Sequence, residues 1–180
     1  MKVLRIDLGS GQRPRGDFGI TLPALGGTVD VTSGIDEDLE KWGWPVLPGT
    51  EHITADLEDV QTWDRIHTIL RQKKVEPACL LSHVLEHLRH PYLLLERVAA
   101  LQPVHTTVVV PNASVSRADW VDTQHRFSWT GGSLVNLVND FGVVRKMGWF
   151  GPLLDLAVQY VPTGSEDSSP PSPSPTHDCR

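Results

Sequence analysis

The residues Val3-Leu4-Arg5-Ile6-Asp7-Leu8 form a β-like, largely apolar run that leads directly into Gly9-Ser10-Gly11. Such a run bounded by a glycine turn is typical of a strand followed by a tight loop. The glycines allow positive φ and let a bound ligand approach the backbone. Because Pro14 stands where G-x-G-x-x-G would need a glycine, a dinucleotide pyrophosphate site is disfavoured. The stretch predicts a first strand whose carboxyl end is either a ligand loop or simply a tight turn.

Outward from this strand, β-like and helical patterns alternate along the chain. Further strands are expected over 17–21 or 28–32, 51–56, 77–82, 106–110, 143–145 and 156–161. Helices are expected from Trp63 to Leu70, directly after Ser82, from Leu94 to Leu101 with Pro103 ending it, and from Leu134 to Phe141 with Gly142 as C-cap. This alternation predicts an α/β fold: a Rossmann-like, mainly parallel sheet of about seven strands, the last antiparallel, with helices on both faces.

The composition fits one folded domain. Of 180 residues 39% are hydrophobic, and 22 acidic against 16 basic side chains give a net charge of −6. We expect the domain to span residues 1–162, and the Pro/Ser-rich residues 163–180 to form a disordered tail. No apolar run approaches the ~20 residues of a membrane span, and the first residues do not resemble a signal peptide. We therefore expect a cytoplasmic protein, and the acidic balance gives no strong nucleic-acid signal.

Polar and glycine residues follow several of the expected strands. In parallel sheets of this type, ligands bind beyond the carboxyl ends of the strands, where the strand order reverses. The segment Asp7–Gly11 follows the first strand, Asp56 ends the third, and Ser82 and His83 lie at the end of the fourth. We therefore expect these groups around one crevice, together with an acid at the end of the second strand.

Five short stretches occur in a characteristic order. They are Asp7-Leu8-Gly9-Ser10-Gly11, Ala55-Asp56-Leu57-Glu58, Leu81-Ser82-His83-Val84-Leu85-Glu86-His87-Leu88, Val108-Val109-Val110-Pro111-Asn112 and His125-Arg126-Phe127-Ser128-Trp129-Thr130. In this order they resemble class I S-adenosylmethionine-dependent methyltransferases, in particular small type 11-like members. The resemblance covers about residues 3–150 and implies S-adenosylmethionine as the cofactor. It also implies methyl transfer by in-line displacement to an acceptor that the sequence does not name.

The resemblance implies a role for each part of the crevice. The cofactor's amino-acid end would lie along the first motif, with candidate residues Asp7, Gly9, Ser10 and Gly11. Asp56 would accept a hydrogen bond from the adenine amino group, and Leu57 would offer the ring an apolar face. Ser82 and His83 would line the crevice near the methyl group.

The acid that would hold the ribose hydroxyls depends on which segment forms the second strand. If residues 17–21 form it, Thr21 occupies the position where the family has an acid, whereas Asp30 could supply the carboxylate only if residues 28–32 form it. Pro14 and Pro23 also leave little or no helix between the first two strands. These departures motivate an alternative function, a catalytically degenerate scaffold that binds a partner.

A third hypothesis comes from the same segment. His83-Val84-Leu85-Glu86-His87 spells H-x-x-E-H, the inverted zinc-peptidase signature. On a helix, His83 and His87 would share one face and could bind zinc, with Glu86 activating a water. A simpler interpretation makes Glu86-His87 a helix start, and the methyltransferase hypothesis assigns no metal ligand.

The reacting side of the crevice is less defined. His83 and His125 are the candidate catalytic residues. His125 lies in an expected loop, and the imidazole group, which in unperturbed form titrates near neutrality, is the side chain most often used as a general base. Trp42 and Trp44 either anchor a loop or stack a planar substrate. We expect the methyl acceptor to be a small molecule or a carrier-linked group.

Overall fold

The computed structural model describes residues 2–9, 15–21, 35–48, 50–115 and 125–163. Its centre is a seven-stranded sheet in the order β3-β2-β1-β4-β5-β7-β6. Ser10, Gly11, Asp30 and the expected tail from residue 164 onward lie outside the described residues. In the part of the chain that is described, no helix is long and apolar enough to cross a membrane.

The strands confirm the expected α/β class. Their bounds are β1 (Val3–Leu8), β2 (Phe18–Thr21), β3 (Glu51–Thr54), β4 (Glu76–Ser82), β5 (Thr106–Val110), β6 (Gly142–Phe150) and β7 (Asp155–Pro162). The strands β1 to β5 pair in parallel. The last strand, β7, runs antiparallel to both β5 and β6, as expected.

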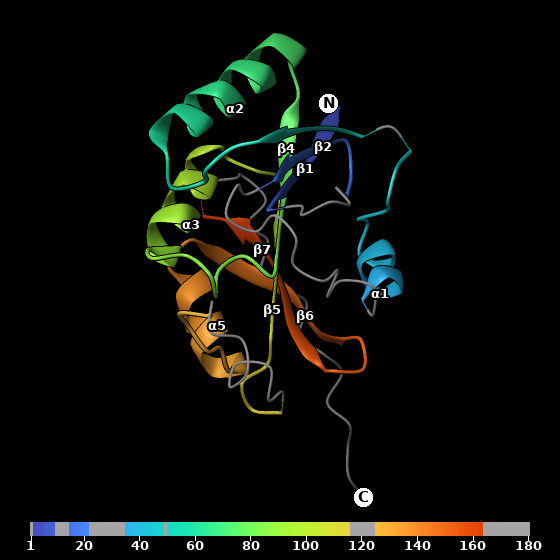
Figure 1. Cartoon of the computed structure of the whole chain (residues 1–180), viewed down its shortest axis with the longest axis vertical. Coiled ribbons are helices and arrows are strands. Elements are labelled where there is room, and N and C mark those ends of the chain that lie inside the picture. Colours follow the sequence, from blue (N-terminus) through green and yellow to red (C-terminus); the bar gives the residue numbers. More distant parts are fainter. Residues whose placement is uncertain (1, 10–14, 22–34, 49, 116–124, 164–180) are drawn as a thin grey trace, which may run out of the picture.

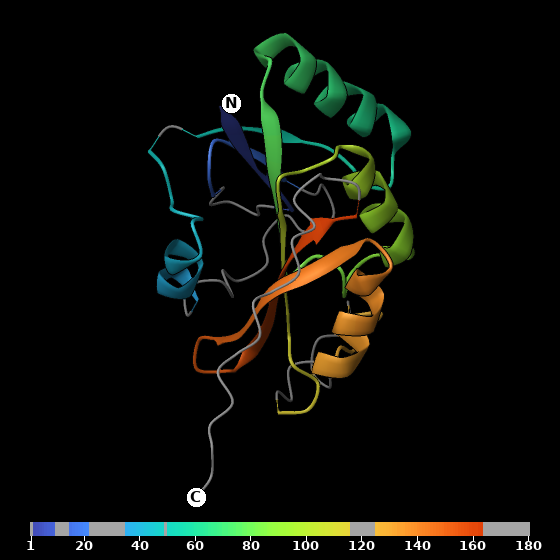
Figure 2. The same ribbon diagram turned by 180° about the vertical axis from the view of Figure 1, so that it is seen from behind.

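Helices cover both faces of the sheet (Figures 1 and 2). One face carries α2 (Val60–Lys73), α3 (Pro91–Ala100) and α5 (Gly131–Asn139), and the short α1 (Asp36–Lys41) lies on the other. Local sequence sets several of these ends. Asp59 caps α2 by accepting a hydrogen bond from the Gln61 amide, and Thr130 with Ser133 forms a capping box at the start of α5.

The two faces have separate hydrophobic cores. The core under α2, α3 and α5 is large and continuous, with Ile6, Leu81 and Leu95 at most 1% exposed. On the α1 side a smaller cluster forms, centred on Leu39, Trp44 and other fully buried side chains. Trp44 therefore anchors its loop to the sheet, as one of the two interpretations expected.

The connection from β1 to β2 is described at Gly9 and at residues 15–17, and these residues contain no helix. Arg15 is only 3% exposed in spite of its charge. Its guanidinium donates a hydrogen bond to the Trp44 carbonyl at 3.2 Å and forms an ion pair with Asp36. Polar contacts from Arg15 thus tie this connection to the α1 side of the molecule.

Three expectations about element boundaries are wrong. Residues after Ser82 form turns, not a helix, because His83 adopts a left-handed φ of 54° and the Glu86 carbonyl accepts hydrogen bonds from the Arg126 and Phe127 amides. Gly142 begins β6 and does not cap α5. A Cβ there would lie 2.3 Å from the Val161 carbonyl oxygen, so the close approach of β7 requires glycine. The strand β6 also continues beyond residue 145 to Phe150.

Candidate functional site

The candidate site lies at the carboxyl edge of β1 and β4. The chain leaves β1 towards β2 on one side of the sheet order, and β4 lies on the other side. This reversal is the topological switch point, where α/β sheets of this type bind ligands. The register pairs Asp7 of β1 with Leu80 of β4, so Gly9 and Ser82 follow at the same edge.

Asp7 is a buried carboxylic acid at the end of β1, only 3% exposed. Burial raises its pKa from 3.8 to about 7, although a hydrogen bond from the Arg15 amide and the Arg15 charge act in the opposite direction. Its Oδ2 accepts that amide hydrogen bond at 2.8 Å. Asp7 therefore holds the returning chain beside β1, and a strongly shifted pKa at a switch point is typical of a functional site.

Gly9 turns the chain away from β1 with a φ of 96°. A Cβ on Gly9 would lie 2.3 Å from Cγ2 of Val84, in the loop after β4. The two loops are thus in close contact, and glycine is required by both the φ angle and the space. Beside this contact, Ser82 Oγ is buried and has no hydrogen-bond partner among the described residues.

The residues expected beside adenine lie in the turn after β3. Asp56 is exposed, and its Oδ1 accepts a hydrogen bond from the Glu58 amide at 2.8 Å. Leu57 is 1% exposed and packs in the large core, so it offers no open apolar surface here. Its carbonyl accepts hydrogen bonds from Trp63 and Arg97. The turn is therefore rigidly held, with Asp56 as its accessible acid.

The second strand is Phe18–Thr21, so Thr21 ends it. The alternative segment 28–32, with Asp30, lies outside the described residues. A ribose-binding role for Asp30 stays a prediction, as do the roles of Ser10 and Gly11.

His83 lies between two buried carboxylates. Its Nδ1 is 3.4 Å from Glu86 Oε1, and its Nε2 is 3.3 Å from Asp155 Oδ2. Burial lowers the pKa of His83, but Asp155 and Glu86 outweigh it and raise the pKa to about 10. The imidazole is therefore protonated at neutral pH, which does not suit a general base. Sequence reasoning missed Asp155, because only the reversed direction of β7 brings its first residue to this edge.

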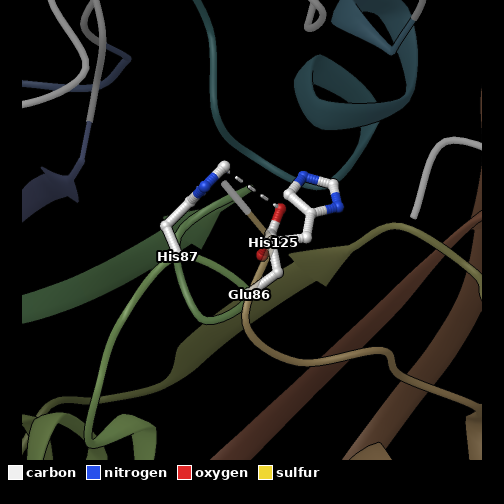
Figure 3. A group of neighbouring side chains, drawn as sticks. All are labelled: Glu86, His87 and His125. Atoms are coloured by element: carbon white, nitrogen blue, oxygen red, sulfur yellow. Dashed lines mark ion pairs between the residues drawn. The ribbon is translucent and has the colours of Figure 1, made fainter. Parts of the chain in front are cut away.

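Glu86, His87 and His125 form a cluster beside His83. One donor atom from each lies within 4.8 Å of the others, and the Glu86 carboxylate lies between the two imidazole rings (Figure 3). The rings of His87 and His125 meet edge to face, with centroids 4.8 Å apart. Because residues 83–87 form turns, His83 and His87 do not share a helical face. The inverted zinc-peptidase geometry expected from H-x-x-E-H is therefore wrong.

Comparison with known proteins gives similarity at the level of structure. No family model and no curated protein matches the chain. A solved pericyclic reaction enzyme superposes with a TM-score of 0.53 at 13% identity, covering 89% of this chain and 43% of its own. Magnesium protoporphyrin IX methyltransferase from Synechocystis PCC 6803, solved with bound S-adenosylhomocysteine, superposes with a TM-score of 0.51 at 12% identity. The match covers 90% of this chain and 75% of the methyltransferase. The chain has the class I methyltransferase fold.

A third structure with this methyltransferase fold is a complex of the Haloferax volcanii activator Trm112 with a methyltransferase. It gives a TM-score of 0.52 at 10% identity and covers 89% of this chain and 82% of the matched chain. The chain spans less than half the length of the pericyclic enzyme. Since one fold carries such different chemistries, the activity has to be argued from the site.

Proposed function

We propose that this chain binds S-adenosylmethionine at the edge between β1 and β4 and transfers its methyl group to a small or carrier-linked acceptor. The observation that carries the proposal is the switch-point arrangement of Asp7, Gly9 and Ser82. At the ends of these neighbouring strands lie a buried acid, a glycine with φ of 96° and a buried hydroxyl that has no hydrogen-bond partner in the described part of the chain. Solved structures with the same fold, one with bound S-adenosylhomocysteine, support this choice of ligand.

The described residues fit the polar parts of such a cofactor. Ser82 Oγ needs a hydrogen-bond partner, and a buried hydroxyl without one costs about 1–3 kcal/mol. Gly9 has no side chain, so a ligand can approach the backbone at this edge. The exposed carboxylate of Asp56 is suited to accept a hydrogen bond from the adenine amino group. Val84 fills the space beside Gly9, so ligand entry between the two loops requires the Val84 side chain to move.

When bound, S-adenosylmethionine supplies a methyl group on a positively charged sulfur. The contribution of the chain is to bind, orient and exclude water from the reacting groups. In this proposal Ser82 donates a hydrogen bond to the cofactor, Asp56 accepts one from adenine, and Asp7 fixes the Gly9 loop through the Arg15 amide. His125 is the candidate general base, because the protonated His83 serves instead as a fixed positive charge.

Calorimetric titration of the full chain with S-adenosylhomocysteine tests the cofactor site. We expect micromolar affinity, and about a tenfold weaker affinity for Asp56→Asn, because an uncharged amide oxygen accepts a weaker hydrogen bond from the adenine amino group than a carboxylate does. Asp64→Asn is the matched control, since Asp64 is also exposed and lies within α2, outside the turn that carries Asp56. Absence of binding at millimolar ligand, or equal affinity for both variants, contradicts the proposed site.

A non-catalytic scaffold is the second candidate function. It is favoured by the contact of Val84 with Gly9, which closes the edge, and by Thr21 at the end of β2. A Val84→Ala variant separates the two functions. If it binds S-adenosylhomocysteine markedly more tightly than the wild type, the closed edge is the barrier to binding, and the scaffold is the better description of the wild-type chain.

A further inference from the structure

We propose that Glu86, His87 and His125 form a binding site for a divalent transition-metal ion, with Zn²⁺ as the preferred ion. The site goes beyond the proposed methyl transfer, which assigns no metal. An ion bound here takes up the donor nitrogen of His125, so the general-base role proposed for His125 applies to the metal-free chain. It lies at the carboxyl edge of the sheet, between the loop after β4 and the segment that leads into α5 (Figure 3).

The carboxylate of Glu86 is the first observation behind this proposal. Glu86 is fully buried; its Oε1 lies 3.4 Å from His83 Nδ1 and 4.0 Å from His87 Nε2, but neither Oε1 nor Oε2 has a hydrogen bond among the described residues. Buried carboxylates in native proteins are paired, hydrogen-bonded or bound to metals, because removing their charge from water is costly. The imidazoles around Glu86 are themselves metal donors, so a cation at this point would satisfy the carboxylate.

The second observation is the donor geometry. Donor atoms of Glu86, His87 and His125 already lie within 4.8 Å of one another. Zinc bonds of about 2.0–2.2 Å in a tetrahedron bring donors to roughly 3.3 Å from each other. Side-chain rotations that move each donor inward by about 1 Å reach that distance. Hydrogen bonds already join the two backbone segments that carry these donors, because the Glu86 carbonyl accepts from the Arg126 amide at 2.6 Å and the Phe127 amide at 3.3 Å.

The donor set selects the class of metal. Two imidazoles with one carboxylate are typical ligands of zinc sites that keep an open position, and of other first-row transition metals. Mg²⁺ and Ca²⁺ prefer oxygen donors and are poorly matched. His83, with its Nδ1 3.4 Å from Glu86, competes with the ion for this carboxylate. Its second contact, to Asp155, remains when Glu86 turns towards the metal.

Direct metal analysis of the full chain tests the site. After tag removal and chelator treatment, zinc is titrated in competition with a chromophoric chelator. We expect one high-affinity zinc per chain and a rise in Tm of about 5 °C at saturation. Because His177 and Cys179 near the carboxyl end are further donors, the titration is repeated on His177→Asn/Cys179→Ser, which should bind zinc equally well.

Two variants and one control make the assignment specific. Loss of a direct ligand in Glu86→Gln or His125→Asn should weaken zinc binding by at least about 100-fold. His90→Asn is the control, because His90 is exposed and lies outside the cluster. If Glu86→Gln does not fold, His125→Asn, which changes a less buried residue, decides alone. Unchanged affinity in His125→Asn, or no stoichiometric zinc in the wild type, overturns the proposal.

The metal site and the cofactor site are tested separately. Zinc affinity is measured without S-adenosylhomocysteine, and metal selectivity is checked by adding excess Mg²⁺, which should not displace zinc. Displacement by Mg²⁺ would contradict the assigned donor set. Either site can be present without the other, so failure of one titration leaves the other result intact.

Discussion

The two faces of the sheet are built in different ways. On β1, Leu4, Ile6 and Leu8 face the large core under α2, α3 and α5, whereas Arg5 and Asp7 face the α1 side. Side chains alternate between faces along a strand, so one strand contributes apolar residues to one side and charged residues to the other. The face under α2, α3 and α5 is thus stabilised by a continuous apolar core. The α1 face is stabilised by a smaller apolar cluster and by polar contacts.

The neighbouring strands repeat this difference. On the α1 side, Thr107 Oγ1 accepts hydrogen bonds from the Trp44 indole and from Gln159, each at 3.1 Å. Gly148 lets β6 approach Trp42, because a Cβ there would lie 2.9 Å from the Trp42 ring. Small and polar sheet residues thus let the loop that carries Trp42 and Trp44, the tryptophan loop, lie close to the sheet. The buried acid of the proposed cofactor site, Asp7, belongs to this polar face.

The largest effect is expected from removing the main side chain of the smaller core. Trp44 is fully buried, so Trp44→Ala should reduce the free energy of unfolding by about 3–5 kcal/mol and leave Thr107 with one hydrogen bond fewer. Chemical denaturation measures this loss. Trp149→Ala is the matched control, because Trp149 is 59% exposed and should change stability by no more than about 0.5 kcal/mol.

Leu94→Ala on α3 measures how much the large core contributes to stability. Leu94 is 3% exposed in the large core, and its loss should cost about 2–5 kcal/mol. If Trp44→Ala is nearly neutral while Leu94→Ala is strongly destabilising, the α1 face contributes little to stability, and the tryptophan loop is free for another role.

Much of the architecture could be predicted from local sequence. The strands β1, β4 and β5 are short apolar runs between turn residues, and α2 and α3 have a clear apolar stripe. Apolar runs and stripes are formed by residues close together in the chain, so a single sequence is enough to recognise them. The carboxyl edge that brings Asp7 and Ser82 together then follows from the parallel strand order.

What could not be predicted depends on contacts between distant segments. A helix was expected directly after Ser82, but the Glu86 carbonyl accepts hydrogen bonds from the amides of Arg126 and Phe127. Arg15 is charged but buried, because its partners Trp44 and Asp36 follow much later in the chain. Asp155 joins His83 only because β7 reverses direction. Periodicity and composition carry no information about such partners.

An intermediate effect is expected at two glycines with positive φ, one beside each core. Gly9 has a φ of 96° and meets Val84, whereas Gly43, after α1, has a φ of 90° and no atom within 4 Å of an added Cβ. Gly43→Ala should cost about 1 kcal/mol from backbone strain, and Gly9→Ala about 3 kcal/mol from strain and overpacking. Denaturation of both variants measures the difference.

The Val84 contact is isolated by a double variant. In Gly9→Ala/Val84→Ala the collision is removed, so the combined loss should be about 1–2 kcal/mol smaller than the sum of the single losses. Additive losses would mean that Val84 already has room to move, and that the edge between β1 and β4 opens without strain.

A pH dependence is expected from Asp7 on the polar face. Its pKa is about 7 in the folded protein against 3.8 when exposed. Between these values the unfolded chain releases the proton while the folded chain keeps it, so stability falls as pH rises, by at most about 1.4 kcal/mol per pH unit.

In Asp7→Asn the amide oxygen can still accept the Arg15 hydrogen bond, but the titration is absent. The free energy of unfolding of the variant relative to the wild type should therefore rise by about 2 kcal/mol from pH 5 to pH 7. Because His83 is present in both proteins, its own titration cancels in this difference. Parallel stability curves would show that Asp7 is ionised throughout, and that the Arg15 amide and charge offset its burial.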